Sequence, residues 1–227
     1  MKKQLLKAVL FDMDGVLYDS LPNHAYSWVK AMQDNGLSMT REDVYANEGR
    51  IGVETIQIIA RREGKNIDLE ERKRIYQEKT KLFVTCPPTL VMPGSLELLK
   101  QVTTDGLIAK VVTGSGQPSL FNKIHVDFHG FIKQSDVLTS FDLSKGKPDP
   151  EAYLTALMKW NLKACEVIVV ENAPLGVESA KAAGLFVIAV NTGPLPDSSL
   201  IDAGADLLFP SLQALSDHWA NLYFFPL

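Results

Sequence analysis

The sequence predicts an α/β fold, in which a Rossmann-like, doubly wound parallel sheet forms the core and carries an inserted α-helical cap. Over most of the chain, short apolar runs alternate with segments of helical periodicity, which is typical of parallel strands joined by crossover helices. Between about residues 18 and 90 this alternation stops, and amphipathic helical stretches follow one another. We therefore expect the core at 1–17 and 91–227 and the cap at 18–90.

Apolar runs rich in Val, Ile, Leu and Phe predict the strands of the core. The runs are KAVLF (7–11), LIAKVV (107–112), VIVV (167–170), FVIAV (186–190) and ADLLF (205–209). Helical segments at 150–160 and 174–184 separate the later runs, and the second ends at Gly184. Glycine is common just after a helix because it adopts positive φ readily. This order of elements indicates helices on both faces of a parallel sheet.

Helical periodicity predicts the cap. Its helical stretches are 22–36, 53–64 and 68–84. The many charges of the last stretch are typical of a solvated helix face. Pro87 and Pro88 mark the return to the core, where Ser95 is expected to be the N-cap of the next helix.

Composition and charge exclude several classes of function. The chain has 227 residues, of which 46% are hydrophobic and 22% charged, as in soluble globular proteins. A net charge of −4 gives no basic field for nucleic acid or an anionic membrane, so we expect neither as a partner. No apolar stretch approaches the roughly 20 residues of a membrane span. Two cysteines without a ligand cluster predict reduced thiols in a cytoplasmic protein.

Chemistry-bearing residues gather where the predicted strands end. These residues are Asp12-Met13-Asp14-Gly15, Thr113-Gly114-Ser115 and Glu171-Asn172, with Lys147 before a proline-led helix start. Open parallel sheets bind ligands at the carboxyl ends of their strands. Each motif alone is more often a turn or loop, but together they supply oxygen ligands for a hard cation and donors for a phosphoryl group. That combination predicts magnesium-dependent phosphoryl transfer.

The same motifs resemble those of the haloacid dehalogenase superfamily. DMDGVLYDS, TGS, KGKPDP and ENAPLGVESAKAAG stand where its four motifs are expected, in the branch with a helical cap after the first motif. That branch contains β-phosphoglucomutase, sugar-phosphate phosphatases and an inorganic pyrophosphatase. ENAPLGVE and the start of the cap resemble the pyrophosphatase type most. Members of this branch are often monomers, and we expect a monomer here.

The resemblance implies roles for the two acids of the first motif. Asp12 would attack phosphorus and form an aspartyl-phosphate. Asp14 would protonate the leaving oxygen and then take a proton from the water or hydroxyl that releases the phosphoryl group. Mg²⁺ would bridge Asp12 and the substrate phosphate, with the backbone carbonyl of Asp14 as a further ligand.

The resemblance also implies how the substrate is held. Thr113 and the backbone donors of Gly114 and Ser115 would bind the phosphoryl oxygens. Lys147 would offset the negative charge that Asp12 shares with the phosphate. In the cap, His24 and Lys79 match positions that support a proton relay and the substrate phosphate in the mutases, and we expect both in the site.

Two departures from the family pattern bear on the substrate. Asn172 stands where most relatives have Asp, which removes a negative charge from the metal site, although Glu171 can contribute directly or through water. Glu48 and Gly52 stand where the mutases have a lysine and a phosphate-binding arginine, with Arg50 nearby as a partial substitute. Glu48 is either a solvent-facing loop acid or a metal ligand that restores the missing charge when the cap closes. The second alternative favours pyrophosphate over a hexose phosphate.

Three functions stay open at this point. The first is a magnesium-dependent phosphohydrolase that acts on pyrophosphate or a small phosphomonoester. The second is a β-phosphoglucomutase that moves phosphate between hexose positions. The third is a non-catalytic phosphate-binding or receiver-like domain. Receiver domains also place acids, Thr and Lys at the end of a parallel sheet, but they are about half as long and need no acid at the position of Asp14.

Overall fold

A parallel six-stranded sheet forms the core of the computed structural model, which describes residues 6–222. Its strand order is β5-β4-β1-β6-β7-β8, and all neighbouring pairs are parallel. The strands are β1 (Ala8–Phe11), β4 (Ile108–Val112), β5 (Val137–Leu138), β6 (Val167–Glu171), β7 (Phe186–Val190) and β8 (Leu207–Phe209). The predicted fold class is confirmed.

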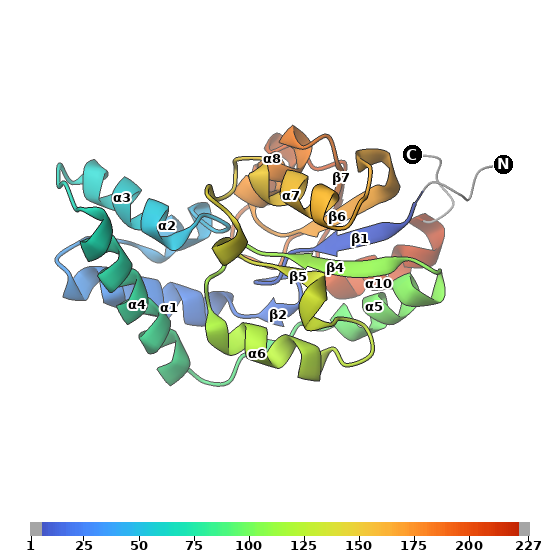
Figure 1. The fold of residues 1–227 in the computed structure, drawn as a ribbon, viewed down its shortest axis with the longest axis horizontal. Helices are drawn as coiled ribbons and strands as arrows, with labels where there is room; N and C mark the ends of the chain where they lie inside the picture. The colour runs from blue at the N-terminus through green and yellow to red at the C-terminus, as the bar shows by residue number, and fades with distance from the viewer. Residues whose placement is uncertain (1–5, 223–227) are drawn as a thin grey trace.

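Helices cover both faces of this sheet (Figure 1). One face packs against α5 (Ser95–Thr104), α6 (Pro118–Asp127) and α10 (Leu212–Leu222). The other packs against α7 (Glu151–Lys159), α8 (Pro174–Ala182) and α9 (Asp197–Asp202). Short 3₁₀ turns lie at Gln134–Asp136, Ser140–Asp142 and Ala164–Glu166. Successive side chains of a strand point to opposite faces, so an unbroken apolar run such as β1 serves both layers.

Four helices form the cap, to the left of the sheet in Figure 1. They are α1 (Leu21–Asp34), α2 (Arg41–Ala46), α3 (Gly52–Arg62) and α4 (Leu69–Thr85). Their apolar faces enclose a separate hydrophobic cluster that includes Trp28, Met32, Ile56, Ile59 and Ile75. The helical spacing of Ile56, Ile59 and Ala60 turns one side of α3 toward this cluster. All four helices lie within the predicted cap range of 18–90.

Two short linkers carry the chain between core and cap. They pair as a two-stranded antiparallel sheet, β2 (Tyr18–Asp19) with β3 (Leu90–Val91). Tyr18 pairs with Val91, and Asp19 pairs with Leu90. This pairing brings the two linkers side by side at the base of the cap.

The structure corrects one local prediction and adds elements to it. Ser95 is the first residue of α5, and the N-cap is Gly94 at φ 88°. A Cβ on Gly94 would lie 2.6 Å from the Cα of Gln213, so a glycine is required there. Helices α2, α6, α9 and α10 and the short strands β2, β3 and β5 were not predicted. Residues 1–5 and 223–227 of the predicted core lie outside the described residues. Among residues 6–222, no helix is both long and apolar enough to cross a membrane.

Candidate active site

The residues predicted at the strand ends meet at or beside a cavity between the sheet and the cap. Asp12 follows β1, Thr113 follows β4 and Lys147 precedes α7, and each is at most 5% exposed. The cavity measures about 60 Å³. Its lining includes Asp12, Asp14, His24, Glu48, Arg50, Tyr76, Lys79, Thr113, Gly114 and Ser115. The fold therefore brings cap and core side chains to one place.

Asp12 is held by a buried ion pair. Lys147 Nζ lies 2.6 Å from Asp12 Oδ1 and 2.5 Å from Glu171 Oε1. Burial, helped by the nearby acids Glu171 and Asp14, outweighs the lowering effect of Lys147 and raises the pKa of Asp12 to about 8. Burial alone would lower the pKa of Lys147, but Asp12 and Glu171 outweigh it and raise that pKa well above its usual range. Lys147 therefore stays a cation, while Asp12 is short of compensating charge.

Glu171 has partners for both of its oxygens. The Tyr153 hydroxyl donates to Oε1 at 2.9 Å, beside the contact with Lys147. Oε2 accepts from the backbone amides of Asn172 at 3.0 Å and Ala173 at 3.2 Å. With this set of partners, Glu171 orients Lys147 and could reach a metal only by exchanging one of them or through water.

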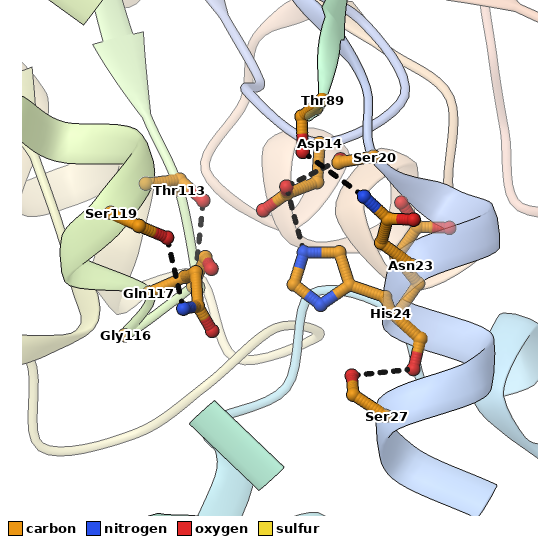
Figure 2. A network of polar contacts seen from close by, with 12 residues as sticks. Asp14, Ser20, Asn23, His24, Ser27, Thr89, Thr113, Gly116, Gln117 and Ser119 are labelled. Carbon is orange, nitrogen blue, oxygen red and sulfur yellow. Dashed lines mark hydrogen bonds and ion pairs between the residues drawn. The ribbon is translucent and has the colours of Figure 1, made fainter. Parts of the chain in front are cut away.

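Asp14 lies in a different electrostatic environment (Figure 2). Ser20 Oγ donates to Asp14 Oδ1 at 2.6 Å, and His24 Nε2 lies 2.9 Å from the same oxygen. Burial would raise the pKa of Asp14, but His24, Ser20 and then Lys79 outweigh it and lower the pKa to about 2. Asp14 is therefore ionised in this arrangement, whereas Asp12 tends to bind a proton.

Lys79 and His24 continue this contact along the cap side of the cavity. Lys79 Nζ lies 2.7 Å from His24 Nδ1 and only 1% of the residue is exposed. Aromatic rings of the cap surround the ammonium group, with centroids 5.1–5.9 Å from it; they belong to Trp28, Tyr76 and Phe83. Burial lowers the pKa of Lys79 to about 7. Burial and Lys79 also lower the pKa of His24, so a neutral ring can accept from Lys79 and donate to Asp14.

The loop after β4 carries Thr113, Gly114 and Ser115. The Ser115 amide donates to Thr113 Oγ1 at 3.0 Å, whereas Ser115 Oγ is buried without a hydrogen-bond partner among the described residues. A Cβ on Gly114 would lie 2.1 Å from the carbonyl oxygen of Gly49 in the cap, which only glycine permits. The Gly49 oxygen also accepts from the Lys147 amide at 3.2 Å. The cap thus rests directly on the predicted phosphate-binding loop.

Glu48 reaches from the cap to the end of β6. Its Oε1 accepts from Asn172 Nδ2 at 3.1 Å. Part of the residue remains in contact with solvent, but burial of the carboxyl group, followed by the charge of Asp12, raises its pKa well above the usual range. Asn172 Oδ1 is buried and has no hydrogen-bond partner among residues 6–222. The contact is incompatible with a fully solvent-facing Glu48.

Tyr76 occupies the space beside Gly52. A Cβ on Gly52 would lie 2.2 Å from two carbons of the Tyr76 ring. The Tyr76 hydroxyl accepts from the Gly116 amide at 3.0 Å and so joins the cap to the phosphate-binding loop. Arg50 lines the cavity, and its Nε donates to Asn47 Oδ1 at 3.1 Å.

Sequence reasoning did not assign roles to several of these residues. Tyr153 and Tyr76 fit the apolar faces of their helices, and nothing in the sequence separates them from core residues. Thr192, after β7, donates to the carbonyl oxygen of Gly15 at 2.6 Å and so steadies the turn that carries Asp14. Ser20 could have been noticed, because it closes the first motif, DMDGVLYDS.

Comparison with known proteins places this geometry among phosphoryl-transfer enzymes. A model of haloacid dehalogenase-like hydrolases matches residues 9–190. Beta-phosphoglucomutase of Bacillus subtilis is 26% identical, over 94% of this chain and 96% of its own. Validoxylamine A 7'-phosphate phosphatase of Streptomyces hygroscopicus subsp. limoneus is 30% identical, over 96% of this chain and 99% of its own.

A solved structure is more similar in sequence. It is a Bacteroides vulgatus protein that is provisionally named a beta-phosphoglucomutase, with 50% identity and a TM-score of 0.92. The similarity covers 96% of this chain and 88% of that chain. The likeness therefore extends over both core and cap.

Proposed function

Because the chain belongs to the haloacid dehalogenase-like hydrolase family, in its β-phosphoglucomutase-like branch, we propose that it is a magnesium-dependent hydrolase of inorganic pyrophosphate that works through an aspartyl-phosphate. The contact between Glu48 and Asn172, beside Asp12, carries this proposal. None of the three relatives reported above has pyrophosphate in its name. The choice of substrate therefore rests on this chain's own residues.

Asp12 is the proposed nucleophile. Lys147 holds its Oδ1, which leaves Oδ2 to attack phosphorus. The new bond joins Oδ2 to phosphorus as the bond to the leaving phosphate breaks, and water then releases the phosphoryl group from Asp12. Lys147 offsets the negative charge of the carboxylate and of the incoming phosphate through both steps.

Asp14 is the proposed acid and base. Its pKa of about 2 means that it must gain a proton as the anionic substrate approaches. His24 Nε2 faces Asp14 and Lys79 Nζ faces His24 Nδ1, so a proton given to Asp14 can be replaced from Lys79. Asp14 would pass this proton to the leaving oxygen. Once ionised again, it would take a proton from the hydrolytic water and return it along the same path.

The donor set at the cavity fits Mg²⁺. Within residues 6–222, no three His, Cys, Asp or Glu side chains converge closely enough to hold a metal by themselves. An amide and a backbone oxygen would therefore have to complete the set, and hard oxygens of this kind suit Mg²⁺. Burial, together with the neighbouring carboxylates, raises the pKa values of Asp12 and Glu48, and Asn172 Oδ1 is unpartnered, so a cation would find free oxygen ligands there.

The proposed ligands follow from this set. They are Asp12, the Asp14 carbonyl, Asn172 and Glu48. Glu171 would act on the metal only indirectly, through the residues that it contacts. When bound, Mg²⁺ supplies positive charge that lessens the repulsion between the nucleophile and the phosphate.

Binding of the transferred phosphate falls to the loop after β4. The Thr113 hydroxyl, the Gly114 amide and the buried, unpartnered Ser115 hydroxyl are donors at the cavity wall. The Ser115 amide would have to leave Thr113 Oγ1 to join them. We propose this set, with Lys147, as the phosphoryl site, and Arg50 as a cation for the distal phosphate.

The lining of the cavity supports a small substrate. Tyr76 fills the place where the mutases have an arginine, and Glu48 stands where they have a lysine. A hexose bisphosphate would lack the arginine and the lysine that the mutases offer it. It would contact the Tyr76 ring and the Glu48 carboxylate instead. This difference ranks the mutase, which the relatives' names suggest, below the hydrolase.

A substrate panel tests the proposal. Phosphate release from pyrophosphate and glucose 6-phosphate, and isomerisation of β-glucose 1-phosphate with glucose 1,6-bisphosphate, are measured with Mg²⁺ and with EDTA. We expect the kcat/KM for pyrophosphate to exceed the others by about tenfold or more and to vanish with EDTA. Faster isomerisation would assign the mutase, and no turnover of any phosphate would favour a binding domain.

A further inference from the structure

We propose that Lys123 and Asp127, one turn apart on α6 of the core, are positioning residues that fix both linkers of the cap and so hold Asp14 in place for proton transfer. The inference rests on the acid–base role proposed above for Asp14. Lys123 and Asp127 lie outside the cavity, and neither belongs to a family motif.

Asp127 fixes the first linker through Tyr18. The Tyr18 hydroxyl donates to Asp127 Oδ2 at 2.9 Å, and the Tyr18 side chain is fully buried. Its ring packs edge-on against Phe128, with centroids 5.4 Å apart. The hydroxyl contact ties β2 to one point on α6.

Lys123 fixes the second linker. Its Nζ donates to the backbone oxygen of Thr89 at 3.1 Å and lies 3.2 Å from Asp127 Oδ2. Lys123 also lies over the Tyr18 ring, 5.6 Å from its centroid. One ion pair on α6 therefore contacts both passages of the chain between core and cap.

The anchored linkers lead directly to Asp14. The Tyr18 carbonyl accepts from the Gly15 amide at 2.8 Å, and the Tyr18 amide donates to Met13 at 3.0 Å, so Tyr18 is bonded to both neighbours of Asp14. On the other side, Asn23 Nδ2 donates to Thr89 Oγ1 at 3.3 Å.

Asn23 is followed in α1 by His24, the partner of Asp14, as Figure 2 shows. Contacts that start from α6 therefore position both the Asp14 carboxylate and its proton donor, His24. This is a positioning role, because neither Lys123 nor Asp127 lines the cavity.

The ion pair itself should contribute little to stability. The Lys123 and Asp127 side chains are 43% and 20% exposed, and pairs of this kind are weak stabilisers. Asp12 and Thr113, in contrast, stand at the ends of β1 and β4 and do not depend on the linkers. Loss of the anchor is therefore expected to lower kcat, which needs Asp14, and to leave KM and the thermal midpoint nearly unchanged.

The test compares Asp127→Ala, Lys123→Met and the double variant with His125→Ala, an exposed position on the same helix. We expect kcat to fall about three- to tenfold in each single variant, with no further loss in the double variant. Lys123→Arg should retain activity, because it keeps a cation at the same place. A kcat equal to that of His125→Ala, or a loss that follows the thermal midpoint, overturns the proposal.

A second measurement separates this proposal from the choice of substrate. Hydrogen–deuterium exchange of segments 14–20 and 86–92 needs no substrate, and both segments should exchange faster in Asp127→Ala than in His125→Ala. Unchanged exchange overturns the anchor even if pyrophosphate is cleaved. If pyrophosphate is not cleaved but p-nitrophenyl phosphate is, the kinetic comparison uses that ester, and only the proposed substrate fails.

Discussion

Asn172 Nδ2 donates a hydrogen bond across 3.1 Å to Oε1 of Glu48, and this contact joins the end of β6 to the cap. An amide that replaces a carboxylate at a metal site lowers its negative charge, and a cap carboxylate at the same place can restore it. If Glu48 is a metal ligand, as we propose, the metal site is complete only when the cap rests on the core. The contact between Glu48 and Asn172 would then affect both metal binding and the choice of substrate.

Asp12→Asn should abolish turnover and stabilise the fold at high pH. With its pKa raised to about 8, Asp12 binds a proton in the folded but not the unfolded chain between about pH 4 and pH 8. Its contribution to stability therefore falls as the pH rises through this window. Without Mg²⁺, the variant should melt near the wild type at pH 4 and above it at pH 9.

Calorimetry at both pH values, with and without Mg²⁺, measures this difference. Added Mg²⁺ should reduce it at pH 9, because the cation neutralises Asp12 in the wild type only. A wild type that melts above the variant at pH 9 without Mg²⁺ contradicts the assigned charge state.

Lys79→Met should change the pH dependence of turnover. Lys79 has a pKa lowered to about 7, and in the proposed relay it replaces the proton that His24 passes to Asp14, so kcat/KM should fall as the pH rises above 7. The kcat/KM of the variant should be about tenfold or more lower at pH 6 and should not show the fall above pH 7. Lys81→Met, at an exposed position of the same helix, is the control. An unaltered profile in Lys79→Met would exclude the relay.

Tyr76 should limit the size of the substrate. Tyr76→Ala opens the space over Gly52 and should raise kcat/KM for glucose 6-phosphate relative to pyrophosphate, by about tenfold. Gly52→Ala should displace the ring and break its contact with the Gly116 amide. Tyr26→Phe, at an exposed tyrosine, is the control. The same ratio of the two substrates in Tyr76→Ala and wild type would contradict this role.

The core was predictable because its signals are local. Each long strand is a mainly apolar run. The polar residues at the ends of β1, β4 and β6 must meet wherever parallel strands end together. Strands of two residues, such as β2, β3 and β5, are too short to give a periodic pattern. The pairing of β2 with β3 at the base of the cap could not be predicted from the sequence for that reason.

The cap side of the site was less predictable because tertiary packing decides it. Lys79 belongs to a charged run that predicts a solvated helix face, yet it is buried among three rings. Tyr76 belongs to the same helix and reaches the core only because Gly52 lacks a side chain. For Glu48, the sequence left a loop acid and a site acid equally open, and the placement of the cap on Asn172 favours the site.

The most direct test of the account is the magnesium dependence of Glu48→Gln with pyrophosphate. Steady-state rates are measured over a range of Mg²⁺ concentrations for wild type, Glu48→Gln and Glu42→Gln, an exposed acid in the preceding helix. If Glu48 completes the metal site, Glu48→Gln should need about tenfold or more Mg²⁺ for half-maximal activity, while Glu42→Gln follows the wild type. Equal activity and an equal Mg²⁺ requirement in Glu48→Gln and wild type would contradict the central claim.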